Sequence, residues 1–198
     1  MTSMVAATGN PHKLEEFARI LTPLGIQVLS PKELGVELDV EETGETFAEN
    51  AYIKAKAFFE ATGKPALADD SGLCVDALGG RPGVYSARYH GEDAPYSHKI
   101  AALVAELEGV PNEQRTARFT CAICCVLDKD TILRAEEHCE GLIGFEPRGS
   151  NGFGYDPILY RGKRSLGEFT DEEKDAISHR GKALRTFARL LGKALQSR

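Results

Sequence analysis

The opening of the chain is the segment that most constrains the fold. An apolar run at 3–8 stops at Gly9, and Asn10-Pro11 then supplies a preferred N-cap and a preferred first helical residue. Apolar residues recur at helical spacing as far as Leu21, and 26–29 resembles the next strand. A strand, a helix and a second strand in this order predict a parallel β-α-β unit.

Two capping boxes predict where further helices begin. Thr46 followed by Glu49 predicts a helix through about Ala61, and Thr170 with Glu173 predicts another helix nearer the C-terminus. After this helix, apolar residues recur at helical spacing and predict a final amphipathic helix. The chain therefore carries helices along its whole length.

Strands are expected between these helices. Residues 66–68 predict a brief strand that delivers Asp69, Asp70 and Ser71, and Asp93 is expected to cap a later helix. Alternating strands are expected on both sides of the turn-like cluster 128–130, and these favour antiparallel pairing. We therefore predict a single α/β domain over 1–198 with a mixed sheet and flanking helices.

Composition narrows the class of protein. The 198 residues are 42% hydrophobic and 27% charged, which suits one well-packed domain. The start has no basic region followed by an apolar run, and no window approaches a membrane-spanning length, so a cytoplasmic protein is expected. The formal charge of −6 argues against coating nucleic acid, but it permits a small phosphorylated ligand.

The five cysteines are expected to be reduced thiols. Cys121 and Cys124 have the spacing of a metal or redox pair, but they lie in 115–127, where apolar and polar residues alternate as in a strand. Strand residues three apart face opposite sides, so one zinc ion does not easily take both thiols. We interpret the segment as a buried strand.

The first candidate binding site is Thr8-Gly9-Asn10 with Lys13. It lies where a strand is expected to turn into a helix, and exposed amides at a helix N-terminus attract phosphate. Glycine lets the backbone approach a ligand closely, and Lys13 adds a positive charge one turn along. The alternative is an ordinary capped turn, because the pattern is not a Walker loop.

The second candidate is acidic. Asp69-Asp70 follows a predicted strand, and Glu41-Glu42 lies upstream. Mg²⁺ usually takes one or two protein carboxylates and keeps water and substrate phosphates as its other ligands. Adjacent strand residues point to opposite faces, so unequal roles are expected for Asp69 and Asp70. The alternatives are a solvated turn and a surface charge pair.

Two further groups suit a nucleotide base. Glycines flank an aromatic residue in Gly152-Phe153-Gly154, which can present a ring for stacking, and Tyr155-Asp156 follows directly. Lys174 and Ser178-His179-Arg180 supply donors around an expected helix start. The alternatives are aromatic residues that fill the edge of a core and a His-Arg pair on the surface.

Together these signals resemble the inosine/xanthosine triphosphate pyrophosphatases over nearly the whole chain, with no departure at a motif position. The segments that carry the resemblance are ATGN (7–10) with Lys13, EETG (41–44) through ENA (49–51), ADDSGL (68–73), GG (79–80) through SARY (86–89), GFGYDP (152–157), and 173–181. The resemblance implies an elongated mixed sheet, two lobes around a central cleft and a homodimer. It also implies magnesium-dependent hydrolysis of ITP, dITP and XTP to the monophosphate and pyrophosphate.

The resemblance also implies roles for single residues. Glu41 and Asp70 would hold the metal, and Asp70 would accept the proton of the attacking water. The residues implied to contact the nucleotide are Thr8, Gly9, Asn10, Pro11, His12, Lys13, Ser71, Phe153, Gly154, Tyr155, Asp156, Lys174, His179 and Arg180.

The expected chemistry is charge neutralisation at the α phosphorus together with a general base. Mg²⁺, Lys13, Lys54 and helix amides are the expected stabilisers, and Asp70 is the expected base. Donors on His179 and Arg180 would pair with O6 of hypoxanthine or xanthine and oppose the amino group of adenine. The alternative function is a regulator that binds purine nucleotides without turnover, which needs no carboxylate base.

Overall fold

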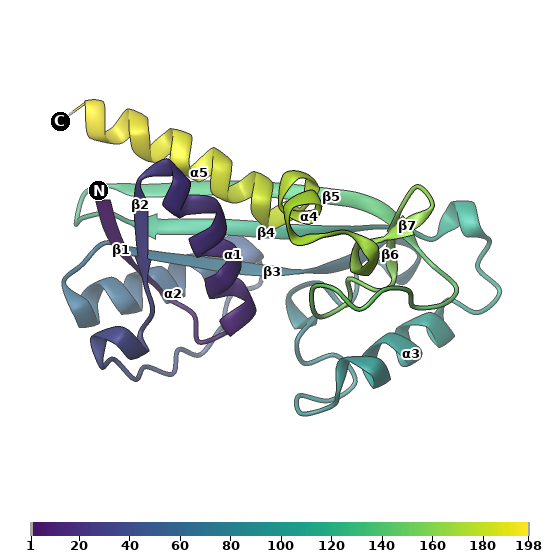
Figure 1. The fold of residues 1–198 in the computed structure, drawn as a ribbon. Helices are drawn as coiled ribbons and strands as arrows, with labels where there is room; N and C mark the ends of the chain where they lie inside the picture. Colours follow the sequence, from purple (N-terminus) through teal and green to yellow (C-terminus); the bar gives the residue numbers. More distant parts are fainter. Residues whose placement is uncertain (1, 198) are drawn as a thin grey trace. The chain divides into compact units, whose positions relative to one another are not determined.

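The computed structural model describes residues 2–197 of this chain, which contain a seven-stranded mixed sheet and five α-helices (Figure 1). The sheet order is β2-β1-β3-β4-β5-β6-β7. The strands are β1 (Thr2–Ala6), β2 (Ile26–Leu29), β3 (Ala66–Val75), β4 (Thr116–Val126), β5 (Ile132–Ile143), β6 (Leu159–Arg161) and β7 (Arg164–Ser165). The α-helices are α1 (Pro11–Leu21), α2 (Phe47–Thr62), α3 (Tyr96–Glu106), α4 (Asp171–Ile177) and α5 (His179–Gln196). The α/β prediction with a mixed sheet is confirmed.

The described residues divide into two compact units. Unit 1 comprises the chain up to Asp70, Cys121–Glu137 and the residues from Arg180 onward. Unit 2 comprises Ser71–Thr120 and His138–His179. Strands β3, β4 and β5 each contribute residues to both units.

Unit 1 opens with the predicted parallel β-α-β arrangement. Strand β1 pairs in parallel with β2, with Val5 opposite Leu29, and also in parallel with β3, with Val5 opposite Ala66. The side chain of Asn10 accepts hydrogen bonds at the start of α1, and Pro11 is the first helical residue. Local capping therefore fixes the point at which the first strand gives way to the helix.

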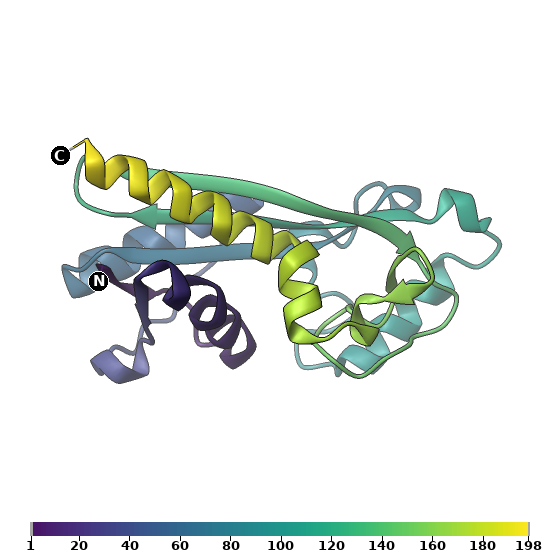
Figure 2. The same cartoon turned by 45° about the horizontal axis from the view of Figure 1, so that its top comes forward.

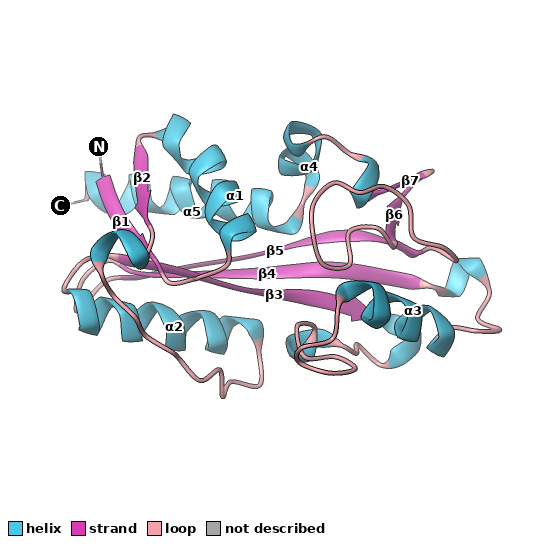
Figure 3. Cartoon of the chain, turned by 60° about the horizontal axis from the view of Figure 1, so that its bottom comes forward, coloured by secondary structure: helices cyan, strands magenta, loops and turns pink. Residues whose placement is uncertain are grey.

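Two hydrophobic cores pack against opposite faces of the sheet in unit 1. One joins the sheet to α1 and α5 through residues such as Phe17, Cys121 and Phe187. The other joins the sheet to α2 through residues such as Cys124 and Phe58. Figure 2 shows α5 alongside β4 and β5, and Figure 3 shows α2 beside the long strands. Cys121 and Cys124 thus face opposite cores, as predicted.

The cysteines behave as core residues. Burial raises the pKa of Cys124 to about 11 and that of Cys125 to about 12, so both thiols stay protonated at neutral pH. Within residues 2–197, no three His, Cys, Asp or Glu side chains converge to hold a metal ion. The same described residues contain no helix that is long and apolar enough to cross a membrane.

Two local predictions were wrong. The acidic pair does not follow a brief strand at 66–68, because β3 continues without a break through Asp69 and Asp70 to Val75. Elements pack on both faces of this strand, so tertiary contacts override the turn propensity of the acidic residues. Helix α3 begins at Tyr96 after Pro95, and Asp93 does not cap it.

Unit 2 has its own core and a buried arginine. The core gathers residues from β3, α3, β4, β5 and the chain around β6, including Leu73, Leu103 and Ile158. Arg115 is 1% exposed and donates to the carbonyl oxygens of Leu107, Ile143 and Gly144 at 2.8–3.0 Å. Its guanidinium satisfies acceptors that burial would otherwise leave without partners.

Candidate active site

The start of α1 lies at the end of β1, as the sequence predicts. The Thr8 hydroxyl accepts from the amide of Asn10 at 3.2 Å, and the Asn10 side chain accepts from the amides of His12 and Lys13 at 3.0 and 3.4 Å. Asn10 therefore takes two of the helix amides that the sequence offers to phosphate. A Cβ at Gly9 would meet no atom within 4 Å, so the backbone there is open to approach.

A buried chain of charges holds Lys13 of this helix. Lys13 Nζ lies 3.0 Å from Asp69 Oδ1. The other oxygen, Oδ2, accepts two hydrogen bonds of 3.1 Å from Nε and Nη2 of Arg180. Arg180 Nη1 donates in turn to Glu16 Oε2 at 2.5 Å. The order Lys13, Asp69, Arg180, Glu16 alternates in sign and links α1, β3 and α5.

This arrangement keeps Asp69 ionised. Burial by itself would raise the pKa of Asp69, but the charges of Lys13, Arg180 and Lys54 outweigh it and hold the pKa well below its usual range. Burial would likewise lower the pKa of Arg180, whereas Asp69 and Glu16 raise it. Asp69 is therefore a fixed anion whose lone pairs are committed to two cations.

Asp70 has different surroundings. Its Oδ2 accepts from Asn50 Nδ2 at 3.1 Å, and its Oδ1 lies 3.9 Å from Lys54 Nζ. Lys54 Nζ is closer to Glu42 Oε1, at 2.7 Å. Asn50 and Lys54 are one turn apart on α2, so the helix presents an amide and an ammonium group to the same carboxylate.

The pKa shifts of Asp70 and Asp69 have opposite signs. Burial is the largest effect on Asp70, and together with Glu42 it raises the pKa despite the opposing charges of Lys54 and Lys13. Burial would lower the pKa of Lys54, but its acidic neighbours raise it, so Lys54 stays positively charged. A buried carboxylate with a raised pKa is a suitable proton acceptor.

The segment before α2 is fixed against the helix. The amide of Gly44 donates to Asn50 Oδ1 at 2.8 Å, and a Cβ at Gly44 would come within 2.6 Å of Glu49 Cβ. The predicted capping box is present, with the Thr46 side chain accepting from the Glu49 amide at 3.2 Å. Only glycine therefore fits at position 44, where the turn brings Glu42 to Lys54.

The predicted base-binding loop lies in unit 2 and is held by its own side chains. Asp156 Oδ2 accepts from the amide of Phe153 and from Lys174 Nζ, each at 2.8 Å. Lys174 Nζ also lies 4.9 Å from the centre of the Phe153 ring. A Cβ at Gly152 would lie 2.1 Å from Asp156 Oδ2, so this position also requires glycine. Asp156 and Lys174 thereby fix the backbone that carries Phe153.

The remaining predicted contacts in unit 2 differ in exposure. Tyr155 is buried in the core, and its hydroxyl donates to the carbonyl oxygen of Ser86 at 3.0 Å. His179 is buried, and its ring stacks on Phe119 with centroids 4.7 Å apart. Ser71 and Gly154 are half-buried. The side chains of Tyr155 and His179 are therefore buried, whereas that of Ser71 is partly accessible.

Three further residues lie at this site in unit 1, of which Glu42 and Asn50 are named from the sequence without a contact and Glu16 is not named. Glu42 pairs with Lys54, whereas its neighbour Glu41, the predicted metal ligand, is exposed. Asn50 bonds to Asp70, and Glu16 bonds to Arg180. The helical spacing of Asn50 and Lys54 could have indicated the contact between Asn50 and Asp70. No local pattern indicates the partners of Glu16 and Glu42.

The comparison with family models decides the family of this chain. A model described as the Ham1 family matches residues 4–190. The chain belongs to the Ham1 family. The matched residues include every motif on which the sequence resemblance rests.

Individual relatives agree with this assignment. The dITP/XTP pyrophosphatase of Bacillus subtilis (strain 168) is 48% identical over 193 residues, which cover 96% of this Ham1-family chain and 98% of that protein. The dITP/XTP pyrophosphatase of Geobacillus kaustophilus (strain HTA426) is 51% identical over 187 residues, with 93% and 91% covered. The solved structure of a HAM1 protein from Coxiella burnetii has a TM-score of 0.88 and 43% identity, and the match covers 98% of this chain and 100% of that one.

The contacts predict that the two adjacent aspartates respond oppositely to neutralisation. Asp70→Asn should lower turnover by about 10²- to 10⁴-fold, because it removes the expected proton acceptor, and should leave the free energy of unfolding nearly unchanged. Asp69→Asn should retain more turnover per folded molecule but should destabilise the protein by about 3–5 kcal/mol, because the buried Arg180 and the half-buried Lys13 lose a counter-charge. Urea unfolding and single-turnover rates measure the two effects. Equal losses of rate and stability at both positions would contradict this division.

Proposed function

We propose that this protein hydrolyses dITP, XTP and ITP to the nucleoside monophosphate and pyrophosphate. The observation that carries the proposal is Asp70, a buried carboxylate with a raised pKa beside Lys54 and Asn50, in a chain of the Ham1 family. The relatives that carry the name dITP/XTP pyrophosphatase support the substrate class. Removal of deaminated purines from the nucleotide pool follows as the physiological role.

The proposed reaction needs few covalent steps from the protein. Asp70 accepts a proton from water, the water oxygen bonds to the α phosphorus, and the bond between the α phosphorus and the bridging oxygen breaks. Pyrophosphate leaves with the electron pair of that bond. Lys54 and Lys13 offset the negative charge, and their own carboxylate partners hold them in place at 2.7 Å from Glu42 and 3.0 Å from Asp69.

We propose Mg²⁺ as the cofactor, and the donor set suits it. Asp70 with Glu41 or Glu42 supplies hard oxygen ligands, and Mg²⁺ takes one or two carboxylates beside substrate phosphates. Glu42 Oε1 lies 2.7 Å from Lys54 Nζ, which lies 3.9 Å from Asp70 Oδ1, so we add Glu42 to the predicted Glu41 as a ligand candidate. When bound, the ion would neutralise phosphate charge.

The assignments on the base side are also proposals. Phe153 is proposed to stack on the base, with Asp156 and Lys174 fixing the loop around it. His179 is proposed to present a donor to O6. Thr8 through Lys13 of unit 1 are proposed to contact phosphates, with Ser71 and 154–155 completing the set.

Larger-scale properties rest on the resemblance. We propose that 1–198 acts as one catalytic domain with two lobes around a cleft, as a homodimer in the cytoplasm. Purine nucleoside triphosphates are its proposed partners, without direct nucleic-acid or membrane binding. The alternative, a regulator that binds nucleotides without turnover, has no use for a buried carboxylate base at Asp70, so the enzyme is the better account.

The position of bond cleavage tests the reaction directly. We expect ITP hydrolysed with Mg²⁺ in ¹⁸O water to give inosine monophosphate and pyrophosphate, with no initial orthophosphate. The monophosphate should carry the label, because the water oxygen bonds to the α phosphorus; label in pyrophosphate would mean attack on the β phosphorus. Initial orthophosphate would mean attack at the γ phosphorus, and tight binding without any product would select the regulator.

Arg180 distinguishes base reading from support of the phosphate site. Its donors are engaged with Asp69 and Glu16 in unit 1, so we expect Arg180→Ala to act through Lys13 on every triphosphate alike. The value of kcat/KM for ITP and for ATP should fall by similar factors, up to about 10²-fold, the loss that a misplacement of roughly 1 Å can cause. Substrate competition assays measure the ratio. A fall for ITP alone would restore the base-reading role that the sequence suggests.

A further inference from the structure

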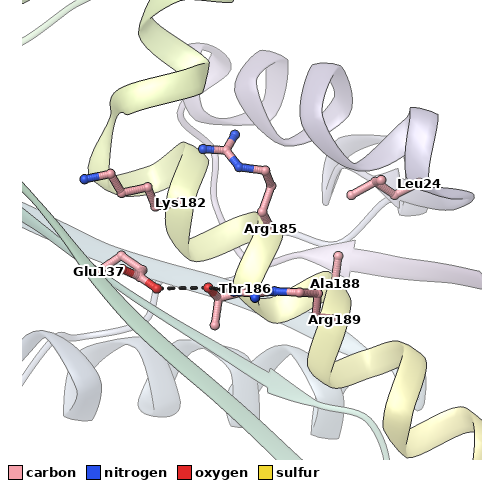
Figure 4. A pocket seen from close by; sticks show the side chains of 7 residues that line it. All are labelled: Leu24, Glu137, Lys182, Arg185, Thr186, Ala188 and Arg189. Atoms are coloured by element: carbon pink, nitrogen blue, oxygen red, sulfur yellow. Dashed lines mark hydrogen bonds between the residues drawn. The ribbon is translucent and has the colours of Figure 1, made fainter.

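Unit 1 contains a pocket that none of the proposed catalytic residues lines. Its volume is about 570 Å³, and it lies between α5, the β5 strand and the turn after α1 (Figure 4). Leu24 comes from that turn and Glu137 from β5. The rest of the lining comes from one helix, α5: Lys182, Arg185, Thr186, Ala188 and Arg189.

The pocket is strongly basic for an acidic protein. Three cations, Lys182, Arg185 and Arg189, line it, and Glu137 is the one carboxylate among its lining residues, which leaves a net charge of +2 (three minus one). The whole chain has a formal net charge of −6. The cations stand three and four residues apart, so the helical repeat places them on one face of α5. Such a local excess of positive charge attracts anions.

Hydrogen bonds order the centre of the pocket. Thr186 Oγ1 donates to Glu137 Oε1 at 2.9 Å and accepts from Nη2 of Arg189 at 2.8 Å. The Glu137 carboxylate therefore accepts a hydrogen bond from the Thr186 hydroxyl, which in turn accepts from Arg189. Figure 4 shows this pair with Arg189 beside Thr186, and with Lys182 and Arg185 further along α5. One guanidinium is thus oriented before a ligand arrives, which reduces the entropy lost on binding.

The helix that carries the cations is anchored on its other face. Leu184, Phe187 and Leu191 of α5 are 0–2% exposed and belong to the core shared with α1 and the sheet. The basic face therefore projects from a rigid element rather than from a mobile loop, which suits a specific site.

We propose that this pocket binds a compact polyphosphate, with inorganic pyrophosphate or the phosphate tail of a nucleotide as the two sources. Guanidinium groups bind phosphate oxygens through paired N–H donors, and Lys182 adds a point charge. A single carboxylate ligand would neutralise less than the net charge of +2, whereas a diphosphate carries enough negative charge to neutralise it in full. The proposal does not depend on turnover, because it concerns a different set of residues from Asp70, Lys54 and Lys13.

Amide chemical shifts of ¹⁵N-labelled protein locate the ligand. We expect pyrophosphate, added without divalent cations at 0.15 M salt, to shift the amides of Leu24 and Thr186 to saturation with a midpoint near or below about 1 mM. Orthophosphate should bind more weakly. The midpoints for pyrophosphate and ATP are then compared. Equal midpoints mean that the pocket recognises only the phosphate groups, whereas a lower midpoint for one ligand identifies that ligand as the preferred source.

Matched substitutions on one helix test the assignment. Arg189→Gln and Lys182→Gln should each raise the pyrophosphate midpoint at least about threefold and leave the basal hydrolysis of ITP unchanged. Lys193→Gln removes the same charge from an exposed position of α5 outside the pocket and should leave the midpoint unchanged. Equal effects of all three substitutions, or shifts confined to 8–13, would overturn the proposal. Shifts of Leu24 and Thr186 that instead follow protein concentration would also overturn it, because a second copy would then cover the pocket.

Discussion

The paired contact between Asp69 and Arg180 is the interaction on which the candidate site depends. It joins residues 111 positions apart in sequence, and the Arg180 bond to Glu16 spans 164 positions. Through Asp69 it also fixes Lys13, so α1, β3 and α5 meet at one buried set of alternating charges. Ion pairs at such depth are stable only when every member keeps its partners, because an unpaired buried charge is strongly unfavourable.

This network explains how two adjacent aspartates can have different chemistry. Successive residues of a strand point to opposite faces, so Asp69 lies among cations and Asp70 faces Asn50 and Lys54 of α2. The pKa of Asp69 is lowered, so its carboxylate stays ionised throughout the usual pH range. The pKa of Asp70 is raised, so in the metal-free protein its carboxylate becomes a base only at a higher pH than an ordinary aspartate. A raised pKa brings proton affinity closer to that needed for general-base catalysis.

The sequence predicts those features that depend on neighbours in the chain. The N-cap at Asn10, the capping box at Thr46 and the alternation around Cys121 are local, and all three are confirmed. It does not predict that β3 runs through Asp69, because packing on both faces of that strand decides this. It also gives no indication that Arg180 bonds to Glu16, since that contact forms only when both ends of unit 1 pack together.

The separation of the two aspartates is the central claim, and a titration of their carboxyl carbons tests it most directly. In metal-free protein labelled with ¹³C at aspartate, and assigned with Asp69→Asn and Asp70→Asn, the Asp69 signal should stay that of a carboxylate down to the lowest pH at which the protein remains folded. The Asp70 signal should titrate at a higher pH than that of an ordinary aspartate, because its pKa is raised. Asp70 titrating below Asp69, or both residues titrating together near the ordinary value, would contradict the account.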